Sequence, residues 1–182
     1  MSNEMIELSN LIKNCKKCDL FKKRKNIVFG DGNSSSKLLL VGEAPGQRED
    51  ESGLPFVGKS GILLTNLLEE VGFFRDKNFY ITNMIKCRPE NNRDPSDDEI
   101  SSCVNYLKMQ IKIIKPKIIL CVGRISSSKI IKQNFKVTRD HGIVFEHKGF
   151  LLMGTFHPAA ILRNKNNLIL VKNDLKKLAN YI

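Results

Sequence analysis

The chain has 182 residues, of which 41% are apolar and 27% charged, and its 30 Lys and Arg exceed its 19 Asp and Glu to give a net charge of +11. This length and composition are typical of one folded domain over residues 1–182 and exclude a wholly disordered chain. The apolar runs fall short of the roughly 18 residues that cross a bilayer, and the N-terminus lacks the apolar stretch of a signal peptide, so we expect a cytoplasmic protein, which we take to be a monomer.

The N-terminal half predicts two buried strands separated by a long loop and a helix. Residues 5–14 have the spacing of a short amphipathic helix, and the apolar run over 37–42 ends in Gly, as buried parallel strands often do. Residues 43–61 are rich in Gly and Pro and are expected to be irregular, and ordered loops of this length tend to be functional. Apolar spacing then predicts a helix over 62–73 and a second strand over 79–87.

The C-terminal half continues the alternation of helices and strands. A capping box over Ser96–Glu99 opens a helix that Pro116 ends, and residues 117–123 form a third buried strand. Residues 125–135 are expected to be helical, residues 142–154 to form a hairpin, and the last residues to form a helix. This order predicts an α/β fold in which helices flank a mostly parallel sheet.

Ligands of such folds bind beyond the carboxyl ends of the parallel strands. We therefore expect the loops that follow Gly42, Thr82 and Gly154 to converge on one site.

Five cysteines, an odd number, argue against a disulfide framework and favour a metal site. Cys15 and Cys18 form a Cys-x-x-Cys pair, and Cys87 and Cys103 lie further along the chain. These four thiols suit either zinc or an iron–sulfur cluster, while packing of Cys103 on its helix is the structural alternative. Cys121 lies inside an apolar strand and is expected to be a core thiol.

The positive charge is spread along the chain rather than concentrated in a tail. It favours a polyanionic partner such as nucleic acid, although an anionic membrane or a genome-wide bias toward Lys would give the same balance. A nucleic-acid surface would have to be assembled by the fold, and its binding would weaken with salt.

Two residues of the Gly-rich loop have the chemistry of a site. Glu43 follows a strand directly and can orient water, unless it is merely a surface acid. Phe56 can stack on a flat base, although most Phe side chains belong to the core. The acidic run over 49–51 is expected to be solvated rather than to bind a metal.

Two further polar residues follow later strands. Asn83 offers a paired donor and acceptor that suits the edge of a nucleobase, or it caps a turn. His157 can stabilise charge on a leaving group, or it is structural.

Several segments in this order resemble the family 4 uracil-DNA glycosylases, the bacterial and archaeal type with an iron–sulfur cluster. The resemblance runs from about residue 10 to the C-terminal helix. It is carried by Cys15-x-x-Cys18, GEAPGQREDESGLPFVGKSG (42–61), TNMIKCRPENNRDP (82–95), Cys103 and HPAAILR (157–163).

The resemblance implies a three-layer α/β/α sandwich with a central four-stranded, mostly parallel sheet, and a 4Fe-4S cluster on Cys15, Cys18, Cys87 and Cys103. The implied activity is hydrolysis of the N-glycosidic bond of uracil in DNA. The nucleotide would be flipped out of the duplex, and the enzyme would be monofunctional and leave an abasic site.

The resemblance also implies roles for single residues. Phe56 would stack on uracil, Asn83 would read its O4 and N3–H, and His157 would donate to O2 as the base leaves. Glu43, with the carbonyl of Gly42, would position water.

A second group of residues would contact the DNA. Ile161, Leu162 and Arg163 would fill the gap left in the duplex, although ordinary helix packing is an alternative for the two apolar residues.

Two residues depart from the family pattern: Ala159 stands where the family usually has a phosphate-gripping Ser, and His141 stands where Arg is frequent. Ala44 aligns with a water-activating Asp of related families, and Ala cannot take that role. The loop over 88–94 contains no His, which argues against the branch that forms a covalent bond to the abasic sugar. A catalytically silent nucleic-acid-binding module is the competing reading; a nucleotide-binding enzyme would need a P-loop or dinucleotide fingerprint, which is absent.

Overall fold

Four parallel strands form the centre of the computed structural model, which describes residues 2–182. In the sheet order β1-β3-β2-β4-β6-β5, the inner strands are parallel and the two edge strands are antiparallel to their neighbours. The strands are β1 (Asp31–Gly32), β2 (Leu38–Gly42), β3 (Phe79–Asn83), β4 (Ile118–Val122), β5 (Val144–His147) and β6 (Phe150–Thr155). The predicted four-stranded sheet is thus the inner part of a six-stranded one, and β1 lies in a segment expected to be a loop.

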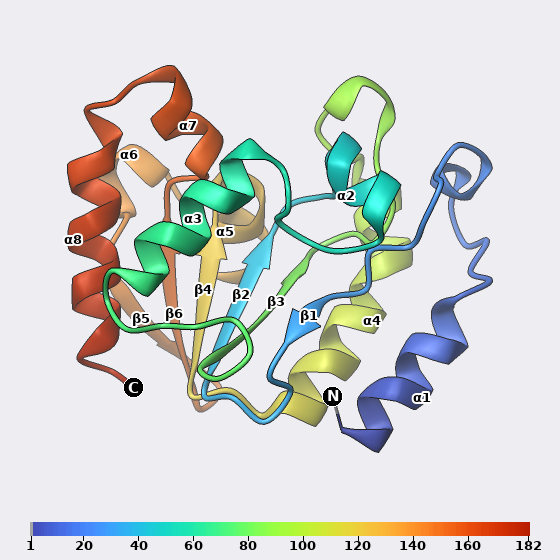
Figure 1. Cartoon of the computed structure of the whole chain (residues 1–182), viewed down its shortest axis with the longest axis horizontal. Helices are drawn as coiled ribbons and strands as arrows, with labels where there is room; N and C mark the ends of the chain where they lie inside the picture. The colour runs from blue at the N-terminus through green and yellow to red at the C-terminus, as the bar shows by residue number, and fades with distance from the viewer. Residues whose placement is uncertain (1) are drawn as a thin grey trace.

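Helices cover both faces of this sheet (Figure 1). Alternate side chains of a strand point to opposite faces, so Leu39 and Val41 of β2 enter one core while Leu38 and Leu40 enter the other. The first core is closed by α1 (Asn3–Ile12), α4 (Asp97–Ile114) and α5 (Arg124–Ile130), and the second by α3 (Lys59–Glu69), α7 (Pro158–Arg163) and α8 (Asn167–Ala179). The three-layer architecture is confirmed.

The capping box that opens α4 is present as expected. Ser96 Oγ accepts from the Glu99 backbone N–H at 3.2 Å, and Glu99 Oε2 accepts from the Ser96 N–H at 2.8 Å. Both bonds satisfy donors that the first turn of a helix leaves free. Cys103 lies two turns further along α4. By fixing where α4 begins, the cap therefore also fixes the face of the helix on which this thiol lies.

The Gly-rich segment is more ordered than its composition indicates, since it contains α2 (Gln47–Ser52). The expectation of a solvated acidic run over 49–51 was wrong for two of its three residues. Glu49 accepts from the backbone N–H groups of Val57 and Gly58 at 2.9 and 2.8 Å, and Asp50 accepts from that of Lys25 at 3.0 Å. Both carboxylates are buried because they satisfy backbone donors that the loop would otherwise leave unpaired.

Strand β3 ends at Asn83, four residues earlier than the predicted 79–87. The chain turns there, and the turn is stabilised by the side chain of Lys86, which points back toward the end of β3. Its ammonium group donates to the Thr82 hydroxyl, the Asn83 carbonyl and Gln110 Oε1 at 2.5–2.7 Å. The remaining helical segments are short: α6 (Val137–Asp140) and single turns over Asp19–Lys22 and Glu90–Asn92. Within residues 2–182, no helix has both the length and the apolar character needed to cross a membrane.

Candidate active site and cysteine cavity

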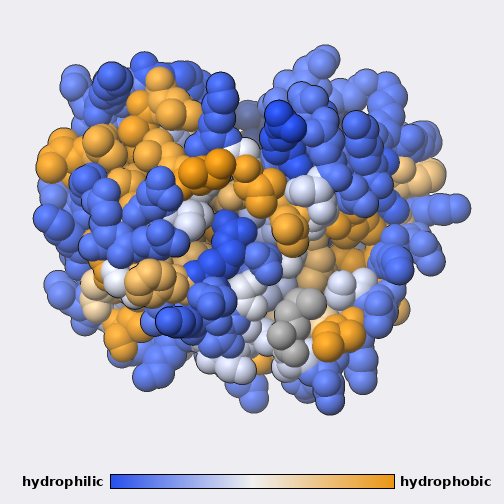
Figure 2. Space-filling view, viewed as in Figure 1, coloured by the Kyte–Doolittle hydropathy of each residue, from blue (hydrophilic) through white to orange (hydrophobic). Residues whose placement is uncertain are grey.

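A cavity of about 620 Å³ opens at the carboxyl ends of the parallel strands, where the sequence predicted the site. Glu43, Phe56, Asn83 and His157 all line it, although they come from three separate segments, the Gly-rich loop and the ends of β3 and β6. Figure 2 shows the molecule notched along this edge, between the part that carries α7 and the part that carries α2. The four candidate side chains therefore converge as the strand topology requires.

Gly42 makes room for two of these side chains. It pairs with Asn83 in the register of β2 and β3. A β-carbon at position 42 would collide with Asn83 Oδ1 and would lie 2.5 Å from Cζ of the Phe56 ring. The bare backbone at Gly42 is therefore what allows an amide and an aromatic ring to share the floor of the cavity.

The Asn83 side chain is buried and incompletely hydrogen bonded. The residue is 2% exposed, and among the described residues its Oδ1 has no hydrogen-bond donor. Leaving a buried acceptor unpaired costs about 1–3 kcal/mol, so native proteins rarely tolerate it without a reason. An unpaired acceptor beside a cavity points to a ligand that carries an N–H group.

Phe56 has a backbone conformation that is unusual for a residue with a side chain. Its φ is 55°, in the left-handed region, which costs a non-glycine residue roughly 1–2 kcal/mol. The ring is buried, and its centroid lies 6.1 Å from that of the His157 ring at an interplanar angle of 35°. Strain of this kind persists where the surroundings impose it, as they often do at binding sites.

His157 caps the N-terminus of α7 with its own ring. Nδ1 accepts from the Ala159 backbone N–H at 3.2 Å, so the proton of the neutral imidazole resides on Nε2. Burial, assisted by the charge of Arg163 and opposed by Glu49, lowers the pKa of His157 to about 4. At neutral pH the side chain is an uncharged hydrogen-bond donor.

Glu43 is partly buried at the wall of the cavity. Burial raises its pKa to about 7, the nearby Asp94 carboxylate adds to the rise, and Arg124 opposes it. The carbonyl of Gly42, which was expected to help hold water, accepts from the Met84 N–H at 2.9 Å and keeps one lone pair.

The three candidate DNA contacts in α7 have different environments. Ile161 is 4% exposed and packs in the core with Val171 and Leu175, as its helix-packing alternative predicted. Leu162 is 57% exposed, and Arg163 is exposed and lines the cavity. The structure therefore presents Leu162 and Arg163 to a partner and directs Ile161 inward.

Sequence reasoning missed the contribution of β4 to the cavity. Gly123 and Arg124 follow this strand and line the cavity, and Arg124 pairs with Asp94 at 2.5 Å. The sequence could have predicted this contribution. The rule that ligands bind beyond the carboxyl ends of parallel strands applies to β4 as it does to the other three. Arg93 also lines the cavity and binds Glu99 through two nitrogens at 2.9 and 2.6 Å.

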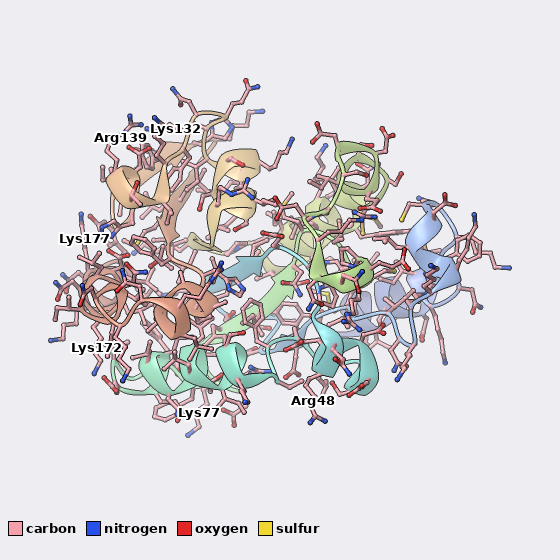
Figure 3. All side chains as sticks on the ribbon, turned by 90° about the horizontal axis from the view of Figure 1, so that it is seen from above. Arg48, Lys77, Lys132, Arg139, Lys172 and Lys177 are labelled. Carbon is pink, nitrogen blue, oxygen red and sulfur yellow. The ribbon has the colours of Figure 1, made fainter. Side chains whose placement is uncertain are left out.

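The remaining positive charge is distributed over the outer surface. Figure 3 shows six labelled basic side chains at the periphery, pointing outward, of which only Lys172 and Lys177 share an element, α8. Several have acidic neighbours: Lys172 lies 2.7 Å from Glu70, and Lys132 and Arg139 lie 3.5 and 2.8 Å from Asp140. The cavity itself is approached by Arg93, Arg124 and Arg163 from three segments. As the sequence predicted, no detached basic tail is needed to place positive charge at the site.

The four cysteines singled out by their spacing line a second cavity. Cys15, Cys18, Cys87 and Cys103 all line it, together with Arg24, Lys86 and Tyr106. Arg24 Nη1 donates to Cys87 Sγ at 3.4 Å, and the Tyr106 hydroxyl lies 3.3 Å from Cys15 Sγ. Cys121 is fully buried in β4, where burial raises the pKa of its thiol, as expected for a core residue.

The cysteine cavity has the donor set of a metal centre. Burial raises the pKa of Cys87 to about 11 and also raises the pKa of Cys18 and Cys103, so the apoprotein holds protonated thiols there. Iron or zinc would supply the positive charge that turns them into thiolates. Within residues 2–182, no three metal-binding side chains meet closely enough to hold a single ion; the four thiols instead surround a shared space. The donor set fits a thiolate-bound group.

Comparison with known proteins identifies the fold. A family model of the uracil DNA glycosylase superfamily matches residues 29–181. These residues include every strand described above and all the residues that line the larger cavity. The match covers most of the chain. The fold and its cavity therefore belong to the class of base-excising glycosylases that this superfamily describes.

Three curated relatives place the chain within that class. Each is named a type-4 uracil-DNA glycosylase. The protein of Sulfurisphaera tokodaii is 45% identical over 90% of this chain and 78% of its own length. That of Saccharolobus solfataricus is 41% identical over 94% and 83%, and that of Thermotoga maritima is 39% identical over 98% and 95%. The chain belongs to the type-4 uracil-DNA glycosylase family.

Replacing Gly42 by alanine tests whether the bare backbone at this position creates the base-sized space. The added methyl group meets Asn83 and the Phe56 ring. A displacement of about 1 Å at a reacting site can cost roughly 100-fold in rate, so we expect Gly42→Ala to fold but to excise uracil from an oligonucleotide about 100-fold more slowly. Gly72→Ala is a control for folding, since a β-carbon there meets no atom within 4 Å although its φ of 86° strains alanine. Equal activity of Gly42→Ala and the wild type would contradict the view that the base binds in the space beside Gly42.

Proposed function

We propose that this protein hydrolyses the N-glycosidic bond of uracil in DNA after flipping the nucleotide into the larger cavity, and that it leaves an abasic site. The observation that carries the proposal is the buried, unpaired Oδ1 of Asn83 beside an aromatic ring and a neutral His. The names of the relatives agree with this activity. DNA containing uracil is accordingly the partner.

Asn83 would read the base edge. Its unpaired Oδ1 accepts from N3–H of uracil, and its amide group donates to O4. Cytosine lacks a proton on N3 and carries an amino group at C4, so both contacts would become unfavourable. A buried site built for one hydrogen-bond pattern rejects the reversed pattern strongly. Phe56 would hold the base by stacking.

His157 would stabilise the leaving group. Cleavage leaves an oxocarbenium-like sugar and a uracil anion, and Nε2–H of the neutral imidazole is available to donate to O2 as the negative charge develops. The base cannot reach the cavity within a duplex, so the exposed Leu162 would occupy the gap in the stack. Arg163 beside it would contact a backbone phosphate.

Glu43 is the group best placed to orient water. Its neighbour Ala44 has no side-chain acceptor, and the other two acidic residues that line the cavity already have partners. Glu49 accepts from two backbone N–H groups, and Asp94 pairs with Arg124. As the carboxylate, Glu43 would hold the water that attacks the sugar. No Lys lines the cavity among the described residues, which supports hydrolysis without an amine nucleophile.

Cys15, Cys18, Cys87 and Cys103 would hold a 4Fe-4S cluster. When bound, such a cluster supplies a rigid, thiolate-linked anchor for distant parts of the chain. Here that anchor would tie the N-terminal segment and α4 to the loop after β3. Arg24 and Lys86 would offset the negative charge of the thiolates.

The activity is tested with labelled oligonucleotides that contain uracil opposite guanine, opposite adenine or in a single strand, followed by alkali to cut abasic sites. We expect cleavage only after alkali, and none for T·G pairs. Asn83→Ala and His157→Ala should fold normally and lose about 10²–10³-fold in rate. Asn10→Ala and His147→Ala, at exposed positions far from the cavity, are matched controls. Wild-type protein that binds the DNA without excising uracil would instead be a silent binding module.

The pH dependence separates the two titratable groups of the cavity. Glu43 acts as a carboxylate and has a pKa of about 7, so the single-turnover rate should rise with pH up to about 7 and then level off. His157 is already neutral above a pH of about 4 and adds no limb in this range. Glu43→Gln should lower the rate and remove the acid limb. A limb that persists in Glu43→Gln would assign it to another group.

The cluster is tested by its colour and iron content. Cys87→Ala should lose the visible absorption band, most of the bound iron and much of the thermal stability. Cys121→Ala removes a fifth thiol that lies outside the cysteine cavity and should keep both the band and the iron. An unchanged spectrum for Cys87→Ala, or a wild-type protein that binds only zinc after anaerobic reconstitution with iron and sulfide, would contradict the proposed cluster.

A further inference from the structure

We infer that Arg75 is a positioning residue that holds the Phe56 ring at the angle that the flipped base requires. This inference rests on the proposed function, because it concerns how the stacking ring is oriented. Arg75 follows α3 and does not line the larger cavity. It therefore acts on the base only through another residue.

The guanidinium group of Arg75 binds the backbone on both sides of the Phe56 α-carbon. Nη1 donates to the Pro55 carbonyl at 2.9 Å, and Nη2 donates to the Phe56 carbonyl at 3.1 Å. The same group is fixed by Thr65 Oγ1 at 3.2 Å and Asp31 Oδ2 at 3.3 Å. Four acceptors around one guanidinium group suit the rigid fork of Arg, which the single ammonium group of Lys cannot reproduce.

Glu49 fixes the backbone just beyond Phe56. Its Oε1 accepts from the N–H groups of Val57 and Gly58. Two carbonyls are thus held by a cation and two amides by an anion, over four consecutive residues. Phe56 lies within this clamped segment with its φ of 55°.

Close packing against α3 restricts the backbone conformations that are open to Phe56. The backbone of Phe56 lies against Gly61 at the start of α3, where a β-carbon would come within 2.5 Å of the Phe56 α-carbon. The left-handed conformation is therefore imposed by Arg75, Glu49 and Gly61 together rather than preferred locally. Without Arg75, two buried carbonyls lose their donor, and residue 56 is released toward the conformations that Phe favours.

The predicted defect is specific. Arg75→Ala should reduce uracil excision under single-turnover conditions by roughly 5- to 150-fold, the range that stacking on one base provides. Its affinity for product DNA with an abasic site should stay near that of the wild type, because that DNA carries no base for Phe56 to stack on. A general folding defect would lower both quantities.

A double-mutant cycle with Phe56→Ala decides whether Arg75 acts through the ring. If it does, the double variant Phe56→Ala/Arg75→Ala excises uracil no more slowly than Phe56→Ala alone. Arg75→Lys should resemble Arg75→Ala, and it gives a second test that keeps the charge should the alanine variant fold poorly. Thr65→Val, which removes one anchor of Arg75 but no contact of Phe56, should excise at a nearly normal rate.

The outcomes separate this inference from the proposed function. Full activity of Arg75→Ala or Arg75→Lys, or losses that add fully in the double variant, would overturn the positioning role and leave the uracil chemistry intact. Normal excision by Phe56→Ala would remove the stacking step itself. A wild-type protein that releases no uracil from any substrate would instead overturn the proposed function.

Discussion

The close approach of β2 and β3 at their carboxyl ends is the constraint on which the site depends. The register that pairs Gly42 with Asn83 places a residue without a side chain beside a buried amide. Only because position 42 carries no β-carbon can the Phe56 ring reach the same point from the Gly-rich loop. The strands themselves are ordinary apolar runs, so the chemistry of the cavity arises from how two of them end rather than from the sheet as a whole.

The two cavities are physically connected through the segment that follows β3. Asn83 and Cys87 are four residues apart, and between them Lys86 donates to the Asn83 carbonyl while its side chain lines the cysteine cavity. Burial lowers the pKa of Lys86 to about 7, and the negative charge that Cys103 carries when ionised opposes this effect. Anything that fixes the four cysteines therefore also fixes the backbone that carries the amide. This connection would give the proposed cluster a structural role, since hydrolysis of a glycosidic bond needs no electron transfer.

Much of the site could be predicted because each residue is a chemically distinct type at the end of an apolar run. Strand order and helix caps are local patterns, and they brought Glu43, Asn83 and His157 together. The burial of Glu49 could not be predicted, because its partners are backbone groups eight and nine residues away in a loop without periodicity. The same applies to Arg75, whose carbonyl partners lie 20 and 19 residues earlier. Such contacts are set by tertiary structure alone.

Burial is the main cause of the pKa shifts of two titratable side chains in the larger cavity, His157 and Glu43. Burial disfavours any charged side chain, so it lowers the pKa of His157 to about 4 and raises that of Glu43 to about 7. Under the proposed mechanism, the departing uracil would meet a neutral N–H donor. That donor would interact more strongly as negative charge develops on O2 than with the resting carbonyl, and this difference would accelerate bond cleavage. The Glu43 carboxyl group is near its midpoint at neutral pH. The same desolvation that keeps His157 uncharged would therefore make the activation of water by Glu43 the pH-sensitive part of the proposed reaction.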